Sequence, residues 1–335
     1  HFFRASSWSL EDIRKRWFSA VRLYAPLYKE GNFHVLVGDG VKQSKEGRRM
    51  PGVKKLFQES ENSAKPEYMH GHMFGGLGIL AGNFRSWACI PLSIRLHDGL
   101  QAAREWKGAS VSTASHVVQM VEDSYHAALT FGDSLLLLDR YFLTVPALEK
   151  LRELNNSGKV HMEIVTKAKK SCTAFQKPGP RKPGRGRPPK KGDAVHLKGL
   201  FASHKEQFME TETELYGKKK TIRYYSIDLL WGQKLYQELR FVLVEMDGIQ
   251  SILASTSLAL DPLSIIRLYS YRFRIECTFR ELKQQTGAFC YHFWSKHMPK
   301  LSYYQKKGEP TPLERVEDER SRKKILKTVR AIEVH

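Results

Sequence analysis

Cysteine, acidic side chains and long apolar runs are scarce in this chain of 335 residues. The four cysteines lie far apart and form no C-x-x-C pair, which argues against a zinc site or a redox motif. They fit a reducing cytoplasm better than a disulfide scaffold. No apolar run approaches the ~20 residues that a membrane helix needs, and no signal peptide is visible. Since the chain begins with His1 rather than Met, we expect a fragment whose start is missing.

The shortage of acidic residues leaves a strongly basic protein. Lys and Arg number 55 against 35 Asp and Glu, a formal charge of +20. Residues 167–198 alone hold eleven Lys or Arg and one Asp, which is half of that excess. A charge of this sign predicts a polyanionic partner, nucleic acid first and an anionic membrane surface second. A hydrophobic content of 41% is enough for a real core and argues against general disorder.

The order of the expected elements indicates an α/β fold. The run Leu135–Leu138 is typical of a strand that is buried on both faces. We expect Gly38-Asp39-Gly40 to end the strand before it, and residues 41–68 to form a loop. The other predicted elements are helices at 8–30, 111–130 and Val145–Leu154, and strands at Phe33–Val37, Met73–Ala81, Trp87–Ile94 and Val160–Val165. Strands that alternate with helices in this way favour a sheet core.

At Lys167 the composition changes. Residues 167–192 are so rich in Lys, Arg, Pro and Gly that we expect no core there. Three strand-like stretches then predict a β-rich insertion: Ala194–Leu200, Thr221–Leu230 and Leu239–Met246. A long helical pattern runs from Pro262 to about Gln285, and the tail after Lys300 is polar and helical in part.

Two aspartates stand where predicted strands end. Asp39 and Asp139 could share a metal ion if their strands are neighbours, since ligands gather at the carboxyl ends of strands. Taken singly, each is more simply a turn or cap residue. Asp98, Asp123 and Asp133 are rival candidates on the same grounds.

The 263–285 helix carries a polar stripe. Tyr269, Arg272, Glu276 and Lys283 fall within roughly a 60° arc of an ideal helix, beside an apolar face. One interpretation is a carboxylate flanked by two cations and a phenol at the rim of the core. The other is a solvated face with an i,i+4 Arg–Glu pair, and periodicity alone favours the latter.

These residues together resemble the bacterial insertion-sequence transposases of the DDE class. Tyr269-x2-Arg272-x3-Glu276-x6-Lys283 has the spacing of that family's YREK signature. Asp139-Arg140-Tyr141-Phe142 resembles its second aspartate segment, and Val37-Gly38-Asp39-Gly40 its first. The similarity spans about residues 31–290, and it includes a long insertion before a glutamate on a helix.

The resemblance implies an RNase H-like mixed sheet flanked by helices, with the β-rich insertion between the second aspartate and the glutamate helix. It implies that Asp39, Asp139 and Glu276 are catalytic and hold two Mg²⁺ or Mn²⁺ ions for phosphodiester hydrolysis and strand transfer. Tyr269, Arg272 and Lys283 are then expected to bind DNA phosphates. The implied partners are double-stranded DNA, as transposon terminal inverted repeats and target DNA, and a second copy in a synaptic homodimer. A bacterial, nucleoid-associated protein without a membrane partner is expected.

The basic segment offers further DNA contacts. Arg185-Gly-Arg187-Pro matches the core of an AT-hook, with Lys190 close behind, and such a core fits a narrow A·T minor groove. The alternative is a flexible linker that touches phosphates without base preference. Trp231 could stack on an unpaired or flipped base, although a core tryptophan is the simpler interpretation.

Two other functions remain open beside transposition: a catalytically inactive DNA-binding derivative, and an RNase H-like nuclease without strand transfer. The expected organisation is an N-terminal helical remnant (1–30), the first part of the core (31–166), a basic AT-hook-like linker (167–193), the β-rich insertion (194–258), the catalytic helix (259–290) and a charged tail (291–335).

Overall fold

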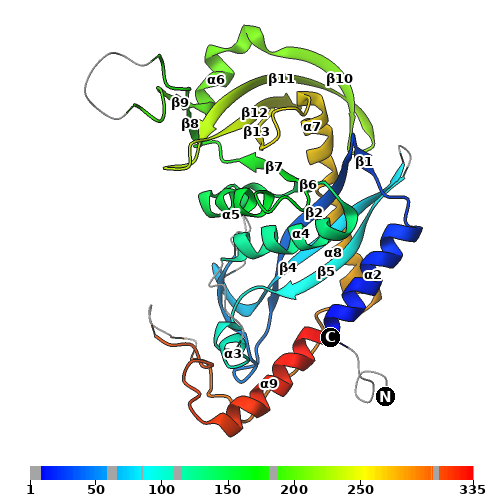
Figure 1. Ribbon diagram of the computed structural model, residues 1–335, viewed down its shortest axis with the longest axis vertical. Coiled ribbons are helices and arrows are strands. Elements are labelled where there is room, and N and C mark those ends of the chain that lie inside the picture. Colours follow the sequence, from blue (N-terminus) through cyan, green and yellow to red (C-terminus); the bar gives the residue numbers. More distant parts are fainter. Residues whose placement is uncertain are drawn as a thin grey trace.

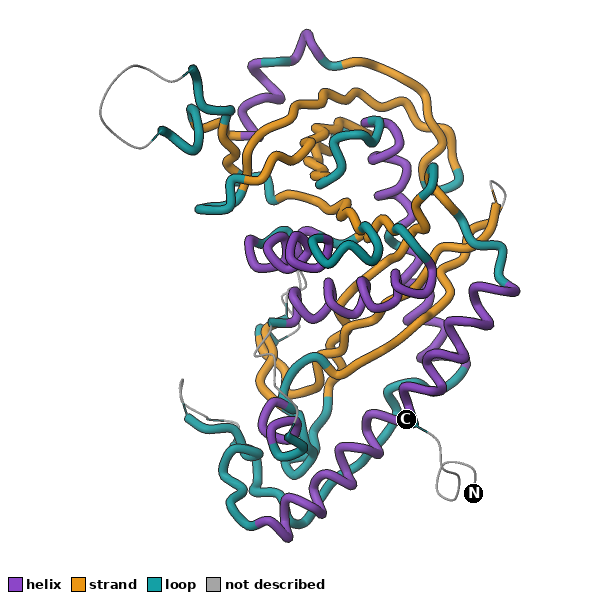
Figure 2. The backbone as a smooth tube through the Cα atoms, in the orientation of Figure 1, coloured by secondary structure: helices purple, strands orange, loops and turns teal. Residues whose placement is uncertain are grey.

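A computed structural model describes residues 9–58, 66–83, 86–108, 115–180, 188–302, 304 and 309–334. Within these residues, thirteen strands form one continuous mixed sheet flanked by helices (Figures 1 and 2). The β-rich insertion lies at one end of the molecule and the C-terminal helix α9 (Glu319–Val334) at the other (Figure 1). The predicted α/β class is therefore confirmed, and so is a helical part of the tail.

The central strands have the order and directions of an RNase H-like sheet. Strand β2 pairs antiparallel with β4, and β4 with β5, whereas β2, β6 and β7 run parallel to one another. The core strands are β1 (Lys29–Glu30), β2 (Phe33–Ser44), β3 (Lys54–Phe57), β4 (Tyr68–Asn83), β5 (Ser86–Leu96), β6 (Ser134–Leu137) and β7 (Met162–Ala168).

Helices cover both faces of this sheet. Helices α4 (His116–Phe131) and α5 (Val145–Asn155) pack on one face, and α7 (Pro262–Tyr271) and α8 (Arg274–Gln285) on the other. The leucine run explains why both are needed: Leu135 and Leu137 join the α7–α8 side, while Leu136 and Leu138 join the α4 side. All four are fully buried, as the sequence predicted. Helices α2 (Leu10–Tyr24) and α3 (Gln101–Glu105) complete the core.

Strand β2 does not end at its glycines, which corrects the prediction that Gly38-Asp39-Gly40 breaks it. The strand continues to Ser44, and β3 also forms inside the expected loop. A Cβ at Gly38 would come within 2.9 Å of Met120 and Leu138 side-chain atoms, and one at Gly40 within 2.9 Å of Met73 and His116 atoms. The glycines therefore let the α4 side pack tightly against the strand that carries Asp39.

The predicted long helix is two helices. Helix α7 ends at Tyr271 and α8 begins at Arg274, and the junction uses tight i→i−3 bonds from Arg272 to Tyr269 and from Glu276 to Phe273. The junction contains neither Gly nor Pro, so the sequence gives no sign of it. The expected stripe is thus divided, with Tyr269 on α7, Arg272 at the junction, and Glu276 and Lys283 on α8.

The insertion continues the core sheet rather than standing apart from it. Strand β13 (Ile249–Ser255) pairs antiparallel with β7, and β12 and β11 follow outward. Two expectations were wrong. Residues 197–200 of the predicted strand Ala194–Leu200 are helical, and Ala174, within the basic segment, is buried in the hydrophobic core of the insertion. The remaining elements are β8 (Thr173–Phe175), β9 (Ala194–His196), α6 (Leu197–Ser203), β10 (Met209–Leu215), β11 (Lys218–Trp231) and β12 (Gln237–Met246).

Candidate active site

Asp39 lies within β2, and Asp139 lies two residues beyond the end of β6, the parallel strand next to β2. The register pairs Val37 of β2 with Leu137 of β6, so each aspartate follows its paired residue by two positions. Val37 and Leu137 face the α7–α8 side, and the alternation of side chains along β2 gives Asp39 the same side. The charge of Asp139 acts on both Asp39 and Tyr269, so Asp139 lies near them. Asp139 directly follows Leu138 and caps a 3₁₀ turn, η1 (Arg140–Phe142), where its Oδ1 accepts the Tyr141 N–H at 2.8 Å.

Arg272 links Asp39 of β2 to Glu276 of α8. Its guanidinium donates to Asp39 Oδ2 at 3.0 Å and to Glu276 Oε1 at 2.5 Å. Asp39 and Arg272 are largely buried, whereas the Glu276 side chain is 55% exposed. The i,i+4 pair of Arg272 and Glu276 that periodicity favoured therefore exists. In addition, Arg272 binds Asp39 of β2.

A glycine lets α8 come close to the aspartates. Asp39 is paired with Gly76 of β4, and a Cβ there would come within 2.4 Å of the Phe279 ring of α8. Any larger residue at position 76 would push α8 away from the sheet. Glu276 precedes Phe279 by less than one turn, so this contact also fixes the height of the glutamate above β2.

Burial and neighbouring charges shift the pKa values of two groups at the site. Burial raises the pKa of Asp39 to about 6; the Arg272 charge and its hydrogen bond oppose this rise, while the charge of Asp139 adds to it. Burial also raises the pKa of Tyr269 to about 12, so its hydroxyl stays protonated at neutral pH. A carboxylate with a pKa this far from its ordinary value is typical of functional sites.

Lys167 belongs to this site, and the sequence reasoning missed it. Leu137 of β6 pairs with Val165 of β7. Lys167 follows Val165 by two positions, just as Asp39 follows Val37 and Asp139 follows Leu137. Burial, together with the charges of Arg140, Lys170 and Arg272, lowers its pKa. Lys167 and Tyr269 line one small cavity of about 90 Å³. The signal that could have found it is a charged residue two positions after the last buried apolar residue of a strand, as Asp39 follows Val37 and Lys167 follows Val165.

The other predicted DNA contacts lie at different distances from the aspartates. Lys283 is exposed on α8, with its Nζ 5.6 Å from the centre of the Phe289 ring. Trp231 ends β11, four strands away from β6, and is half-buried against the core of the insertion. Lys190 is exposed, whereas Arg185 and Arg187 lie outside the described residues. The base-stacking role of Trp231 and the AT-hook stay predictions.

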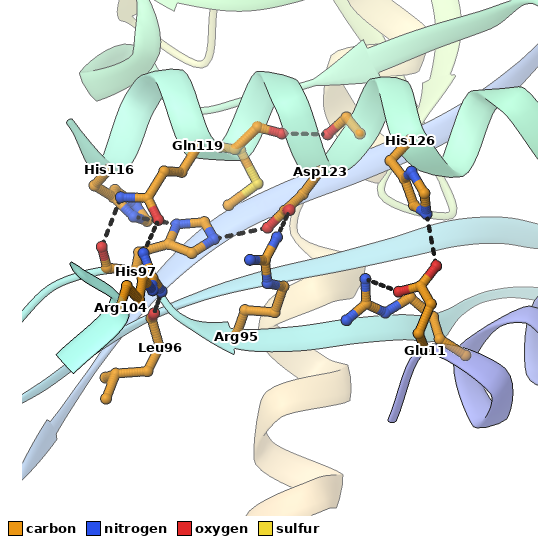
Figure 3. Close-up of polar contacts among 12 residues, drawn as sticks. Glu11, Arg95, Leu96, His97, Arg104, His116, Gln119, Asp123 and His126 are labelled. Atoms are coloured by element: carbon orange, nitrogen blue, oxygen red, sulfur yellow. Dashed lines mark hydrogen bonds and ion pairs between the residues drawn. The ribbon is translucent and has the colours of Figure 1, made fainter. Parts of the chain in front are cut away.

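The rival aspartates have structural partners elsewhere. Asp98 forms an ion pair with Lys54, and Asp133 accepts the His161 N–H at 2.7 Å. Asp123 of α4 binds His97 Nε2 at 2.9 Å and also Arg95 (Figure 3). Helix α4 covers the sheet face opposite Asp39.

The Asp123 network continues through the interior (Figure 3). His97 Nδ1 lies 2.8 Å from His116 Nδ1, and Gln119 Nε2 donates to the His97 carbonyl at 2.6 Å. Burial opposes the Asp123 charge, but the hydrogen bond from His97 and the charge of Arg95 hold its pKa below the ordinary value. The network joins α4 to β5 on the sheet face opposite the site.

Asp123→Ala is expected to lower the free energy of unfolding by about 3 kcal/mol, because it leaves the buried His97 without its carboxylate. Glu153→Ala removes an exposed partner of Lys150 and should cost less than about 1 kcal/mol. Urea unfolding of both variants measures the difference. Equal losses would mean that the Asp123 network adds nothing beyond an exposed ion pair.

The chemistry of the donors suits a hard divalent cation. Mg²⁺ takes one or two carboxylates and completes its shell with water and substrate phosphate. Asp39, Asp139 and Glu276 offer such oxygens, and the charge of Asp139 acts on the buried carboxyl group of Asp39. Among the residues that the structure describes, no three His, Cys, Asp or Glu side chains converge enough to hold a metal ion. Arg272 instead stands between Asp39 and Glu276.

Comparison with known proteins identifies the family. The sequence matches the transposase DDE domain over residues 108–296, more than half of the chain. The chain belongs to the DDE transposase family. The matched part of this transposase includes Asp139 and Glu276, whereas Asp39 lies before it. The family implies that the protein binds DNA.

Other comparisons add little to this. No curated protein matches the sequence. Among solved structures, the NurA nuclease from Sulfolobus solfataricus is similar at 10% identity and a TM-score of 0.25, over 85% of this chain and 95% of that chain. A likeness of this size supports no inference. In the described part of the transposase, no helix has the length and apolar character needed to cross a membrane.

Proposed function

We propose that this transposase cuts DNA at transposon ends and joins the ends to target DNA in one active site, using two Mg²⁺ or Mn²⁺ ions. The observation that carries the proposal is that Asp139, just beyond the end of β6, acts on Asp39 of the adjacent parallel strand β2, with Arg272 linking Asp39 to Glu276. Asp39, Asp139 and Glu276 would hold the ions. When bound, the ions would activate the attacking oxygen and neutralise charge on the leaving oxygen.

The other residues of the site bind and orient the DNA. Arg272 binds two of the carboxylates, and Lys283 lies about two turns further along α8. Both cations attract the phosphates on either side of the scissile bond. Tyr269 keeps its proton and donates a hydrogen bond to a phosphate oxygen. Lys167 adds a partly buried positive charge near Arg140 and Arg272. Water attacks in the cutting step and a DNA 3′-hydroxyl in the joining step, so no covalent enzyme intermediate is needed.

The proposal also covers partners and place of action. The basic charge, half of which lies in residues 167–198, supports binding of double-stranded DNA at terminal inverted repeats and at the target. Joining two ends requires two active sites, which favours a homodimer in a synaptic complex. All four cysteines are free, which fits action on nucleoid DNA in a reducing cytoplasm.

Nicking and joining assays test the proposal against its two alternatives. The substrate is DNA that carries the inverted repeats flanking the gene, incubated with Mg²⁺ or with EDTA. Metal-dependent joined product supports a transposase. Nicking without joining would favour a plain nuclease, and tight binding without either reaction would favour an inactive DNA-binding derivative.

Metal binding is measurable without any reaction. At a hundredfold excess over its Kd, Mg²⁺ is expected to raise the melting temperature by roughly 5 °C, because ligands that bind only the folded state stabilise it. Asp139→Asn should abolish the shift. Asp133→Asn, at the opposite end of β6, is the matched control and should keep it. An unchanged shift in Asp139→Asn would remove Asp139 from the metal site.

A further inference from the structure

A groove opens where β2 ends, on the sheet face that carries Asp39. It encloses about 660 Å³ and begins at Gln43 and Ser44. Asp39, Val41, Gln43 and Lys45 share one side of the chain, since side chains alternate along a strand. At ~3.3 Å per residue, the groove begins roughly 15 Å from the carboxylate of Asp39. A strand of DNA held at the aspartates therefore needs only a few nucleotides to reach it.

The walls of the groove are fixed in place. One wall is the turn at Arg48 and Arg49, and the other is the segment 289–301 that follows α8. Ser295 N donates to the Arg49 carbonyl at 3.0 Å, and Leu301 N to the Arg48 carbonyl at 2.7 Å. These bonds join the two walls across a separation of about 250 residues. The groove is therefore preformed.

A buried lysine anchors the same wall to β2. Lys45 Nζ donates to the carbonyls of Phe289 at 2.6 Å and Tyr291 at 2.8 Å, and it lies 3.8 Å from the centre of the Tyr291 ring. Lys283 Nζ also lies over the ring of Phe289. Lys283, which follows Glu276 on α8, thus contacts a residue that lines the groove.

The lining is basic and carries an exposed aromatic ring. Four of the lining residues are Lys or Arg, against a single Glu. Arg48, His292 and Lys300 are exposed, and the indole of Trp294 is 65% exposed. Positive side chains beside an open aromatic face are the combination that binds single-stranded nucleic acid, because phosphates pair with the charges and bases stack on the ring.

We propose that this groove binds an unpaired stretch of the DNA strand that leaves the aspartates. Arg48 and Lys300 contact its phosphates, and one base stacks on Trp294. The inference rests on the proposed function, because it takes the DNA to be the strand held at Asp39 and Asp139. It adds a second contact on that strand, outside the three carboxylates and the YREK residues.

The test uses the full chain in EDTA, so that no cleavage is needed. A fluorescein-labelled hairpin duplex is compared with the same duplex carrying a five-nucleotide single-stranded extension. The native protein should bind the extended form roughly tenfold more tightly, the effect of about one stacked base. Trp294→Ala should lose that preference and Trp294→Phe should keep most of it. Tyr24→Ala removes a still more exposed ring on α2 and should change nothing.

Charge is tested separately from stacking. Arg48→Ala and Lys300→Ala should each weaken binding of the extended form and make its dependence on salt less steep. Because Arg48, Trp294 and Lys300 are exposed, their replacement should leave the circular dichroism spectrum and the melting temperature unchanged. A tenfold preference that survives Trp294→Ala would overturn the proposal.

A further variant separates failure of the groove from failure of the active site. Asp39→Asn should abolish cleavage and keep the preference for the extension. If no variant cleaves DNA under any condition but the preference depends on Trp294, the groove stands and the proposed reaction fails. If the native protein cleaves and joins DNA without any preference for the extension, the reaction stands and the groove fails.

Discussion

Asp139→Asn is expected to reduce DNA cleavage about a thousandfold while leaving DNA affinity within about twofold of the native protein. Asparagine keeps the shape and the cap on Tyr141 N–H but loses the charge that a divalent ion needs. Loss of one preorganised charge-stabilising group costs on the order of 10²–10³ in rate, and a metal ligand belongs at the upper end. Asp39→Asn and Glu276→Gln should behave alike. Cleavage is measured as nicked product, and affinity by fluorescence anisotropy in EDTA.

Asp133→Asn is again the control, because it changes an aspartate at the other end of the same strand. Its amide oxygen can still accept the His161 N–H, so both activity and stability should stay near native values. A variant at position 39, 139 or 276 that cleaves DNA at a near-native rate would remove that residue from the catalytic set.

Arg272→Ala should lower cleavage by about 10–100-fold, the usual cost of losing a group that orients metal ligands. It should also move the acid limb of the pH–rate profile to higher pH. Cleavage needs Asp39 ionised, so it falls as the pH drops through its pKa, which burial raises to about 6. Arg272 lowers that pKa, and its removal must therefore raise it further. Profiles recorded from pH 5 to 9 at fixed Mg²⁺ measure both effects.

Arg272→Lys separates charge from geometry. Lysine restores a positive charge but cannot bind Asp39 and Glu276 through two nitrogens of one planar group. We expect its acid limb to return toward the native position while the rate recovers only in part. Arg267→Ala, an exposed position on α7, should leave the profile unchanged. An unshifted acid limb in Arg272→Ala would mean that Arg272 does not act on the Asp39 carboxylate.

The strands and helices that form the RNase H-like core followed from local patterns. Leu135–Leu138 indicated a strand buried on both faces, and the periodicity of residues 111–130 indicated a helix at α4. Glycine misled the prediction at β2, because its effect depends on distant partners. Met120, Leu138 and His116 occupy the space beside Gly38 and Gly40, and none of these contacts is visible in a local pattern.

The candidate site was predicted as a set of residues but not as an arrangement. The spacing of Tyr269, Arg272, Glu276 and Lys283 marked the helix, whereas the turn between α7 and α8 depends on packing against the sheet. The bond from Arg272 to Asp39 joins residues 233 positions apart, so no periodicity reports it. Lys167 was missed because it begins the lysine-rich segment 167–192, whose composition gives no sign that this residue lies on β7.

The pairing of β13 with β7 has a consequence for the integrity of the enzyme. Without that pairing, β7 would be the last strand of the core sheet, with a row of unpaired N–H and C=O groups. Such an edge recruits other chains, and buried neighbours such as Ile164 and Val165 would make it prone to aggregate. The insertion therefore closes the open side of the catalytic core. A shortened chain that lacks the insertion is expected to aggregate before it loses catalytic activity. The insertion therefore cannot be removed to obtain a minimal nuclease.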